Sequence, residues 1–133
     1  MRFSYWFKRV GSFFLALFVS GCAGLIGTPD TPEQAVKARA QERWNAMVAK
    51  QFDKAYEYIT PSGRVTLSKQ LHSARLSGAN WLSAKVTSAV CEPEVCDVTV
   101  TLGIEVMPNL PHQQAISEKW ILSGGKWWFV YRG

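Results

Sequence analysis

Two of the three cysteines, Cys91 and Cys96, stand close together between two segments with strand-like composition. The residues between them, at 92–95, are Glu-Pro-Glu-Val, which is typical of a turn. A close thiol pair forms a disulfide in an oxidising compartment, or binds a metal with the help of further ligands. No histidine lies within fifteen positions of either cysteine. The spacing therefore predicts a Cys91–Cys96 disulfide that closes a hairpin and contributes about 2 kcal/mol. It predicts neither a metal site nor a cofactor.

The third cysteine, Cys22, follows a segment typical of a secretory signal. Basic residues open the chain, and an apolar run (VGSFFLALFV) occupies 10–19. This run is far shorter than the about 20 apolar residues that a membrane-spanning helix needs. The sequence Val-Ser-Gly-Cys at 19–22 resembles the lipobox, in which the cysteine is lipidated before cleavage. The alternatives are an ordinary signal peptide that ends near a cysteine and an uncleaved signal anchor.

This resemblance predicts a bacterial lipoprotein precursor with a signal peptide at 1–21, a lipidated cysteine and tether at 22–30, and one domain at 31–133. Several acyl chains on Cys22 would anchor the protein to a membrane more firmly than one chain does. Ala23 follows the cysteine, where an aspartate would resemble the inner-membrane retention signal of Gram-negative bacteria. The expected location is therefore the outer membrane, facing the periplasm.

The charge of the chain changes with this processing. The full sequence has 15 Lys+Arg against 10 Asp+Glu, and three of the basic residues lie within 1–21. The remaining 12 basic residues give a net charge of +2 and form no run of like charges. Nucleic acid is therefore not an expected partner.

The helical part of the domain is expected first. Thr31 can cap a helix that starts at Pro32 and continues to about Lys50. Its apolar residues recur at helical spacing. A second short helix would end before Pro61, and a third would span 67–76. The apolar residues of the first helix are Val36, Ala40, Trp44, Met47 and Val48, and those of the second are Phe52, Ala55, Tyr56 and Ile59.

From Trp81 the apolar period changes to two, which indicates strands. Pro108 and Pro111 predict a loop, and Gly124-Gly125 predicts a tight hairpin. The hairpin turn would pair Leu122 with Trp127, Trp120 with Phe129 and Glu118 with Tyr131 on one face. It would pair Ile121 with Trp128 and Lys119 with Val130 on the other face.

The strand before Cys91 contains a conflict. If the two cysteines face each other, Leu82, Val86 and Val90 point away from the apolar set of the next strand. Either a bulge shifts the alternation, or this strand is covered on both sides. We favour the bulge.

Together these elements predict an α+β domain with N-terminal helices packed on a curved antiparallel sheet of about four strands. Residues 43–64 (RWNAMVAKQFDKAYEYITPSGR) and 118–133 (EKWILSGGKWWFVYRG) resemble the NTF2-like superfamily, also called cystatin-like or SnoaL-like. That resemblance implies a cone with a pocket between helix and sheet. The superfamily contains enzymes, transport factors and non-catalytic envelope domains, so the fold does not select a function.

One carboxyl group, Glu118, could do chemistry in such a pocket. Its strand position places it among apolar residues opposite Tyr131, where burial would raise its pKa and suit it to acid–base work. The plainer interpretation is that Glu118 lies near the end of the sheet and reaches water. His72 and His112 are isolated and are expected at the surface, and no catalytic set can be assigned. The candidate pocket residues are Trp44, Tyr56, Glu118, Trp120 and Tyr131.

A second candidate site is the opposite face of the last hairpin, where Ile121, Trp128 and Val130 would lie together. We expect this face to contact another envelope protein or a second copy of the chain. The leading hypothesis is therefore a membrane-anchored, non-catalytic interaction module. The alternatives are a small-ligand binder that uses the pocket and, last, an enzyme that uses Glu118 and Tyr131.

Overall fold

Helix α1 (Pro32–Val48) begins at the predicted cap, where the Gln34 amide donates to Thr31 Oγ1 over 3.2 Å. The computed structural model describes residues 31–133. The predicted signal peptide, Cys22 and the tether lie outside these residues and stay predictions. Within the described part of the chain, no helix is long and apolar enough to span a membrane.

Three short helices follow α1: α2 (Phe52–Tyr56), α3 (Pro61–Thr66) and α4 (Lys69–Leu76). The sequence did not predict α3, because Pro61 was interpreted only as the end of the preceding helix. Pro61 instead occupies the start of α3, where Thr60 Oγ1 accepts from the Gly63 amide over 3.1 Å. Ser68 caps α4 in the same way.

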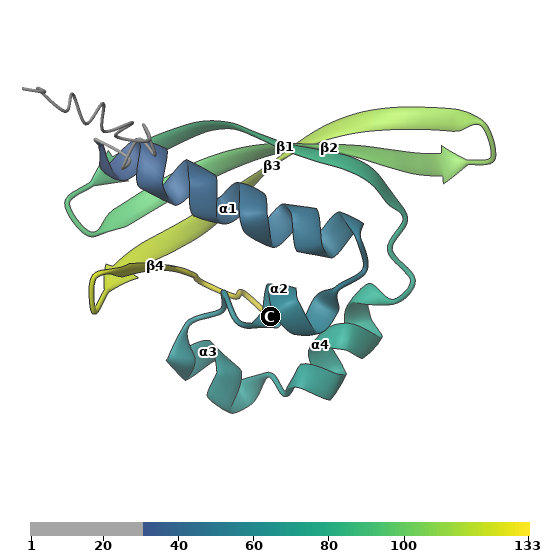
Figure 1. Cartoon of the computed structure of the whole chain (residues 1–133). Helices are drawn as coiled ribbons and strands as arrows, with labels where there is room; N and C mark the ends of the chain where they lie inside the picture. The colour runs from purple at the N-terminus through teal and green to yellow at the C-terminus, as the bar shows by residue number, and fades with distance from the viewer. Residues whose placement is uncertain (1–30) are drawn as a thin grey trace, which may run out of the picture.

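The strands are β1 (Trp81–Glu92), β2 (Val95–Met107), β3 (Leu110–Ser123) and β4 (Lys126–Phe129). They form one antiparallel meander in the order β1-β2-β3-β4. In Figure 1 the sheet curves around α1, with the three short helices below it. The predicted α+β architecture is therefore confirmed.

The bulge in β1 is also confirmed. Cys91 pairs with Cys96 and forms the predicted disulfide. A register shift between Val86 and Ser88 then brings Val86 opposite Val100, and both are buried. Val90 lies between this shift and the disulfide, and its side chain is exposed to solvent.

The β2–β3 connection differs from the predicted loop. It is a tight turn at Pro108-Asn109, and β3 already includes Pro111. Asn109 takes a positive φ of 65°, which asparagine tolerates, and its amide donates to Glu105. The two strands therefore extend as an arm beyond the helices (Figure 1).

The β3–β4 hairpin has the predicted register from Ser123 to Trp120, with Trp120 opposite Phe129 and Ile121 opposite Trp128. Lys119 and Val130 still meet through one backbone hydrogen bond. The predicted Glu118–Tyr131 pair is not formed. The Phe129 backbone instead bonds with Tyr58 and Thr60, and this contact draws the end of the chain away from β3.

The main core lies between α1 and the sheet and includes Val36, Ala40, Met47, Val98, Val100 and Trp120. Gln41 ties α1 to the edge of β1, since its side chain accepts from the Val86 amide and donates to the Ala84 carbonyl.

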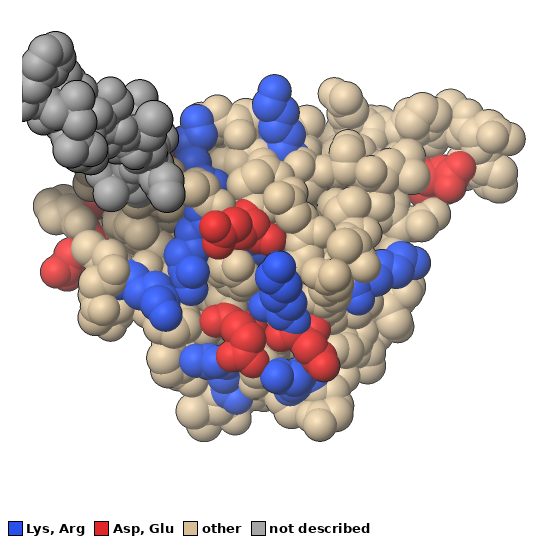
Figure 2. All heavy atoms as spheres, viewed as in Figure 1, with Lys and Arg blue, Asp and Glu red and all other residues tan. Residues whose placement is uncertain are grey.

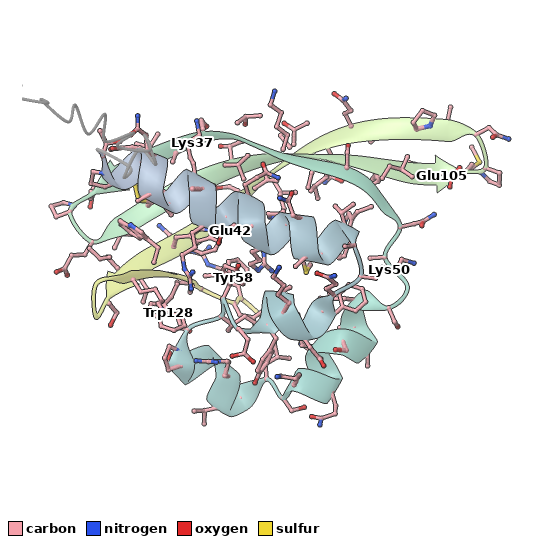
Figure 3. The ribbon with its side chains drawn as sticks, in the orientation of Figure 1. Lys37, Glu42, Lys50, Tyr58, Glu105 and Trp128 are labelled. Atoms are coloured by element: carbon pink, nitrogen blue, oxygen red, sulfur yellow. A yellow bond between two sulfur atoms is a disulfide. The ribbon has the colours of Figure 1, made fainter. Side chains whose placement is uncertain are left out.

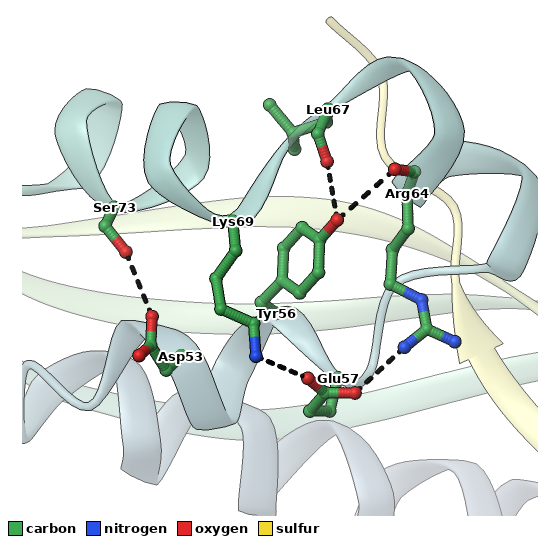
Figure 4. A network of polar contacts seen from close by, with 7 residues as sticks. All are labelled: Asp53, Tyr56, Glu57, Arg64, Leu67, Lys69 and Ser73. Carbon is green, nitrogen blue, oxygen red and sulfur yellow. Dashed lines mark hydrogen bonds and ion pairs between the residues drawn. The ribbon is translucent and has the colours of Figure 1, made fainter.

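A polar network fixes the three short helices against each other (Figure 4). Glu57 bonds with both Arg64 and Lys69, each over 2.9 Å. The Tyr56 hydroxyl donates to the Leu67 carbonyl over 2.7 Å. These contacts set the position of α4 below the sheet.

Candidate functional site

Glu118 lies inside the domain, with 6% of its surface exposed. Its Oε1 accepts from Arg43 Nη1 over 2.7 Å and from Trp44 Nε1 over 2.9 Å. Its Oε2 accepts from Trp120 Nε1 over 3.1 Å. Both carboxylate oxygens therefore have charged or indole donors, and we call Glu118, Arg43, Trp44 and Trp120 the Glu118 cluster.

The expectation that Glu118 reaches water is wrong, because its carboxylate is buried and bonded to Arg43 and Trp44 of α1 and to Trp120. The predicted contact between Glu118 and Tyr131 is not formed either. The hydroxyl of Tyr131 instead accepts from Arg75 of α4. The structure thus joins Trp44, Glu118 and Trp120, and it separates them from Tyr131.

Arg43 connects this cluster with a second polar region. Its residue surface is 4% exposed, and burial lowers the pKa of its guanidinium, while the charge of Glu118 and the hydrogen bond to it offset part of that shift. Nη1 is bonded to Glu118, whereas Nε has no hydrogen-bond partner among residues 31–133. One side of this guanidinium is therefore satisfied, and the other is not.

The second region is a cavity of about 110 Å³ that we call the His72 cavity. It lies where α1 and α4 meet the end of β4 and the C-terminal segment. His72 was expected at the surface, and this expectation is wrong. The residue is 2% exposed, because it lies on the inward-facing side of α4. The lining residues are Arg43, His72, Arg75, Leu76, Phe129, Tyr131 and Arg132.

Within the described residues, neither ring nitrogen of His72 has a hydrogen-bond partner. Burial lowers the pKa of His72 to about 4, and the positive charge of Arg43 adds to this effect, whereas Asp53 opposes it. The imidazole is thus neutral at pH 7. Its ring packs edge-on against Tyr56, with centroids 5.5 Å apart.

Sequence reasoning missed Arg43, His72 and Arg75. A signal existed for the first two. Arg43 occupies a stripe position seven residues after Val36, and His72 stands four residues before Leu76. A polar residue on an apolar stripe requires an internal partner, but the sequence did not identify that partner.

The predicted interaction face is half-buried at Ile121, Trp128 and Val130. The Trp128 ring lies within 6 Å of three cations, at 5.9 Å from Arg39, 5.6 Å from Arg64 and 5.4 Å from Lys126. Its Nε1 donates to the Ser123 carbonyl over 3.1 Å. In Figure 3, Trp128 lies beside β4 near Tyr58. Two of these cations, Arg39 and Arg64, come from α1 and α3, and the sequence did not predict that these helices reach the face.

The β2–β3 arm is a further exposed apolar surface. Val106, Met107 and Leu110 are exposed by 58%, 59% and 50%. Figure 2 shows few charged side chains on the visible side of this arm, whereas red and blue side chains alternate over α1 and α2. The described residues contain no group of three or more His, Cys, Asp or Glu side chains that could hold a metal ion.

No protein-family model matches the chain, and no curated protein sequence matches it. Three solved structures have similar folds. A SEC-C-motif-containing protein from Rhodopseudomonas palustris is 17% identical with a TM-score of 0.57, and the match covers 76% of each chain. A second SEC-C-motif-containing protein, from Psychrobacter arcticus, is 12% identical with a TM-score of 0.58, over 73% of this chain and 60% of that one.

The third is a putative NTF2-like transpeptidase from Campylobacter jejuni, at 9% identity and a TM-score of 0.55, over 73% of this chain and 98% of that one. Identities this low describe the fold and not the activity. The chain therefore has an NTF2-like α+β fold, which it shares with SEC-C-motif proteins.

Proposed function

We propose that this protein is a membrane-anchored lipoprotein of the cell envelope, held by acyl chains on Cys22 and facing the periplasm. Its domain would act as a non-catalytic interaction module. The Cys91–Cys96 disulfide supports an oxidising compartment, because such bonds are rare where thiols are kept reduced.

The state of Glu118 supports a non-catalytic role. A general acid or base needs access to a proton on its substrate. All three groups bonded to Glu118 come from the chain itself, and Arg43 neutralises its charge. Tyr131, the other residue of the enzyme hypothesis, is bonded to Arg75 instead.

The observation that carries the proposal is Trp128 with its three neighbouring cations. Aromatic residues and arginine are enriched at protein interfaces and at their energetic centres. Arg64 is already bonded to Glu57, but the positive charges of Arg39 and Lys126 favour a partner surface with exposed carboxylates. We therefore propose an envelope protein with an acidic, partly apolar patch as the partner of this face.

Native mass spectrometry of the lipidated protein, extracted gently from its own membranes, tests the proposal. The wild type is expected to carry a stoichiometric protein partner that Trp128→Ser loses. Met107→Ser on the β2–β3 arm is the control, since it removes an exposed apolar side chain away from the Trp128 face.

Each other result has a clear meaning. Loss of the partner with Met107→Ser and not with Trp128→Ser would move the contact surface to the arm. A bare wild-type monomer would contradict the interaction role. For the anchor, labelling with a palmitate analogue is expected in the wild type and absent in Cys22→Ala, and equal labelling of both would refute lipidation at Cys22.

A further inference from the structure

The His72 cavity combines features that the interaction role does not use. Three buried nitrogens, Arg43 Nε and both ring nitrogens of His72, have no hydrogen-bond partner among residues 31–133. Both side chains line the same cavity. Buried polar groups in folded proteins are nearly always hydrogen-bonded, so these nitrogens need a partner other than residues 31–133.

The charge of the cavity restricts that partner. Arg75 and Arg132 are exposed and line the cavity, while Arg43 is buried and also lines it. Among the described residues no acidic side chain lines it, and Glu118 contacts Arg43 through Nη1 rather than Nε. Guanidinium groups present paired donors that match the oxygens of a carboxylate or phosphate. The cavity thus favours an anion.

Size and polarity favour the smaller anion of these two. A volume of about 110 Å³ holds a few waters or one small anion. Leu76, Phe129 and the ring of Tyr131 supply apolar walls. A phosphate carries more charge and would have to lose more hydration on entering such a site. A short-chain carboxylate can place its oxygens on the cations and its carbon atoms on the walls.

We propose that the His72 cavity is a binding site for a small carboxylate. Arg75 and Arg132 draw the anion in, and Arg43 Nε and the N–H of His72 donate to its oxygens. Leu76 and Phe129 contact its short apolar part. The hydroxyl of Tyr131, bonded to Arg75, keeps that guanidinium at the cavity.

The test is isothermal titration calorimetry on the lipidated protein in detergent at pH 7, with sodium acetate as the ligand. A ligand this small binds weakly, with a Kd of about 1 mM expected. Sodium phosphate and sodium chloride at equal ionic strength are run in parallel. Saturable heat with acetate and none with chloride is the expected result.

Matched charge-removing variants locate the site. Arg75→Gln changes an exposed cavity residue and is expected to weaken acetate binding at least tenfold. Lys85→Gln removes an exposed positive charge on β1, outside the cavity lining, and is expected to leave the affinity unchanged. A second readout is the NMR signal of the His72 ring, which should shift on adding acetate and not on adding chloride.

Three outcomes would overturn the proposal. Acetate heats equal to those of chloride would mean that only water meets the buried nitrogens. Equal losses in Arg75→Gln and Lys85→Gln would indicate nonspecific attraction to surface charge. Tighter binding of phosphate than of acetate would refute the preference for a carboxylate.

Discussion

The two sides of Arg43 differ in whether their polar groups are hydrogen-bonded within the protein. Toward β3, the guanidinium donates to Glu118, and both carboxylate oxygens of Glu118 accept hydrogen bonds within the Glu118 cluster. Toward α4, Arg43 Nε and the His72 ring have no partner within the described residues. Both regions are buried and polar and share one side chain. The first is complete without a ligand, whereas in the second a bound carboxylate would accept from Arg43 Nε and from the N–H of His72.

The largest expected effect comes from breaking the complete side. Glu118→Gln removes the charge opposite Arg43 and leaves a buried guanidinium uncompensated. Loss of one partner of a buried ion pair costs about 3–5 kcal/mol. Urea denaturation of the variant is therefore expected to show a midpoint far below that of the wild type.

The double variant Arg43→Met, Glu118→Met is the control for this change. It removes both charges, so it should be more stable than Glu118→Gln alone. A Glu118→Gln protein as stable as the wild type would mean that the pair adds nothing to the fold.

The next effect concerns the incomplete side and its pH dependence. In the unfolded chain His72 takes up a proton below its ordinary pKa of 6.5, whereas in the folded chain it does so only near 4. The unfolded state therefore binds more protons between these values. The contribution of His72 to the free energy of unfolding is therefore complete above pH 6.5. It is lost as the pH falls toward 4, by about 3 kcal/mol in all.

Urea denaturation of His72→Phe across the same pH range checks this sign. Acidic groups elsewhere, such as Glu57, titrate equally in both proteins, so the difference between the two curves isolates His72. The wild type should lose more stability than His72→Phe between pH 6.5 and 4. Parallel curves would contradict a depressed His72 pKa.

A smaller effect is expected from removing one neutral donor of the complete side. Trp44→Phe keeps an aromatic ring against Trp81, and the ring centroids of Trp44 and Trp81 are 5.5 Å apart. The substitution removes the indole N–H that donates to Glu118. Hydrogen bonds to a charged acceptor contribute about 2 kcal/mol. Thermal unfolding should show a loss smaller than that of Glu118→Gln, and a loss of equal size would place the energy in the indole rather than the ion pair.

The sequence predicted most of the fold because local signals were strong. Thr31-Pro32 marks the start of α1, and Gly124-Gly125 fixes the register of the last hairpin. The disulfide register revealed the conflict that the β1 bulge resolves. The arm was missed because Pro108 and Pro111 were interpreted as a loop, although a tight turn with Asn109 at positive φ admits both.

The site was predicted much less well, because its contacts join residues far apart in the chain. Trp44, Glu118 and Trp120 were selected, yet the cation that pairs with Glu118 is Arg43, which lies 75 positions away. His72 was placed at the surface because its helical spacing from Leu76 does not show which elements α4 packs against. The alternation of apolar residues along the strand predicted which face of the sheet Glu118 lies on. It did not predict that Arg43 of α1 would contact Glu118 there.

The most direct test of the difference between the two sides is the titration of the His72 ring by NMR, with and without trifluoroacetate, a carboxylate that stays ionised in acid. Arg43, Arg75 and Arg132 surround the ring, and Asp53 acts on it from α2. Without ligand the pKa is expected to be about 4. A bound carboxylate favours the imidazolium, so the account predicts a higher pKa with trifluoroacetate and no change with chloride. An identical pKa under all three conditions would contradict it.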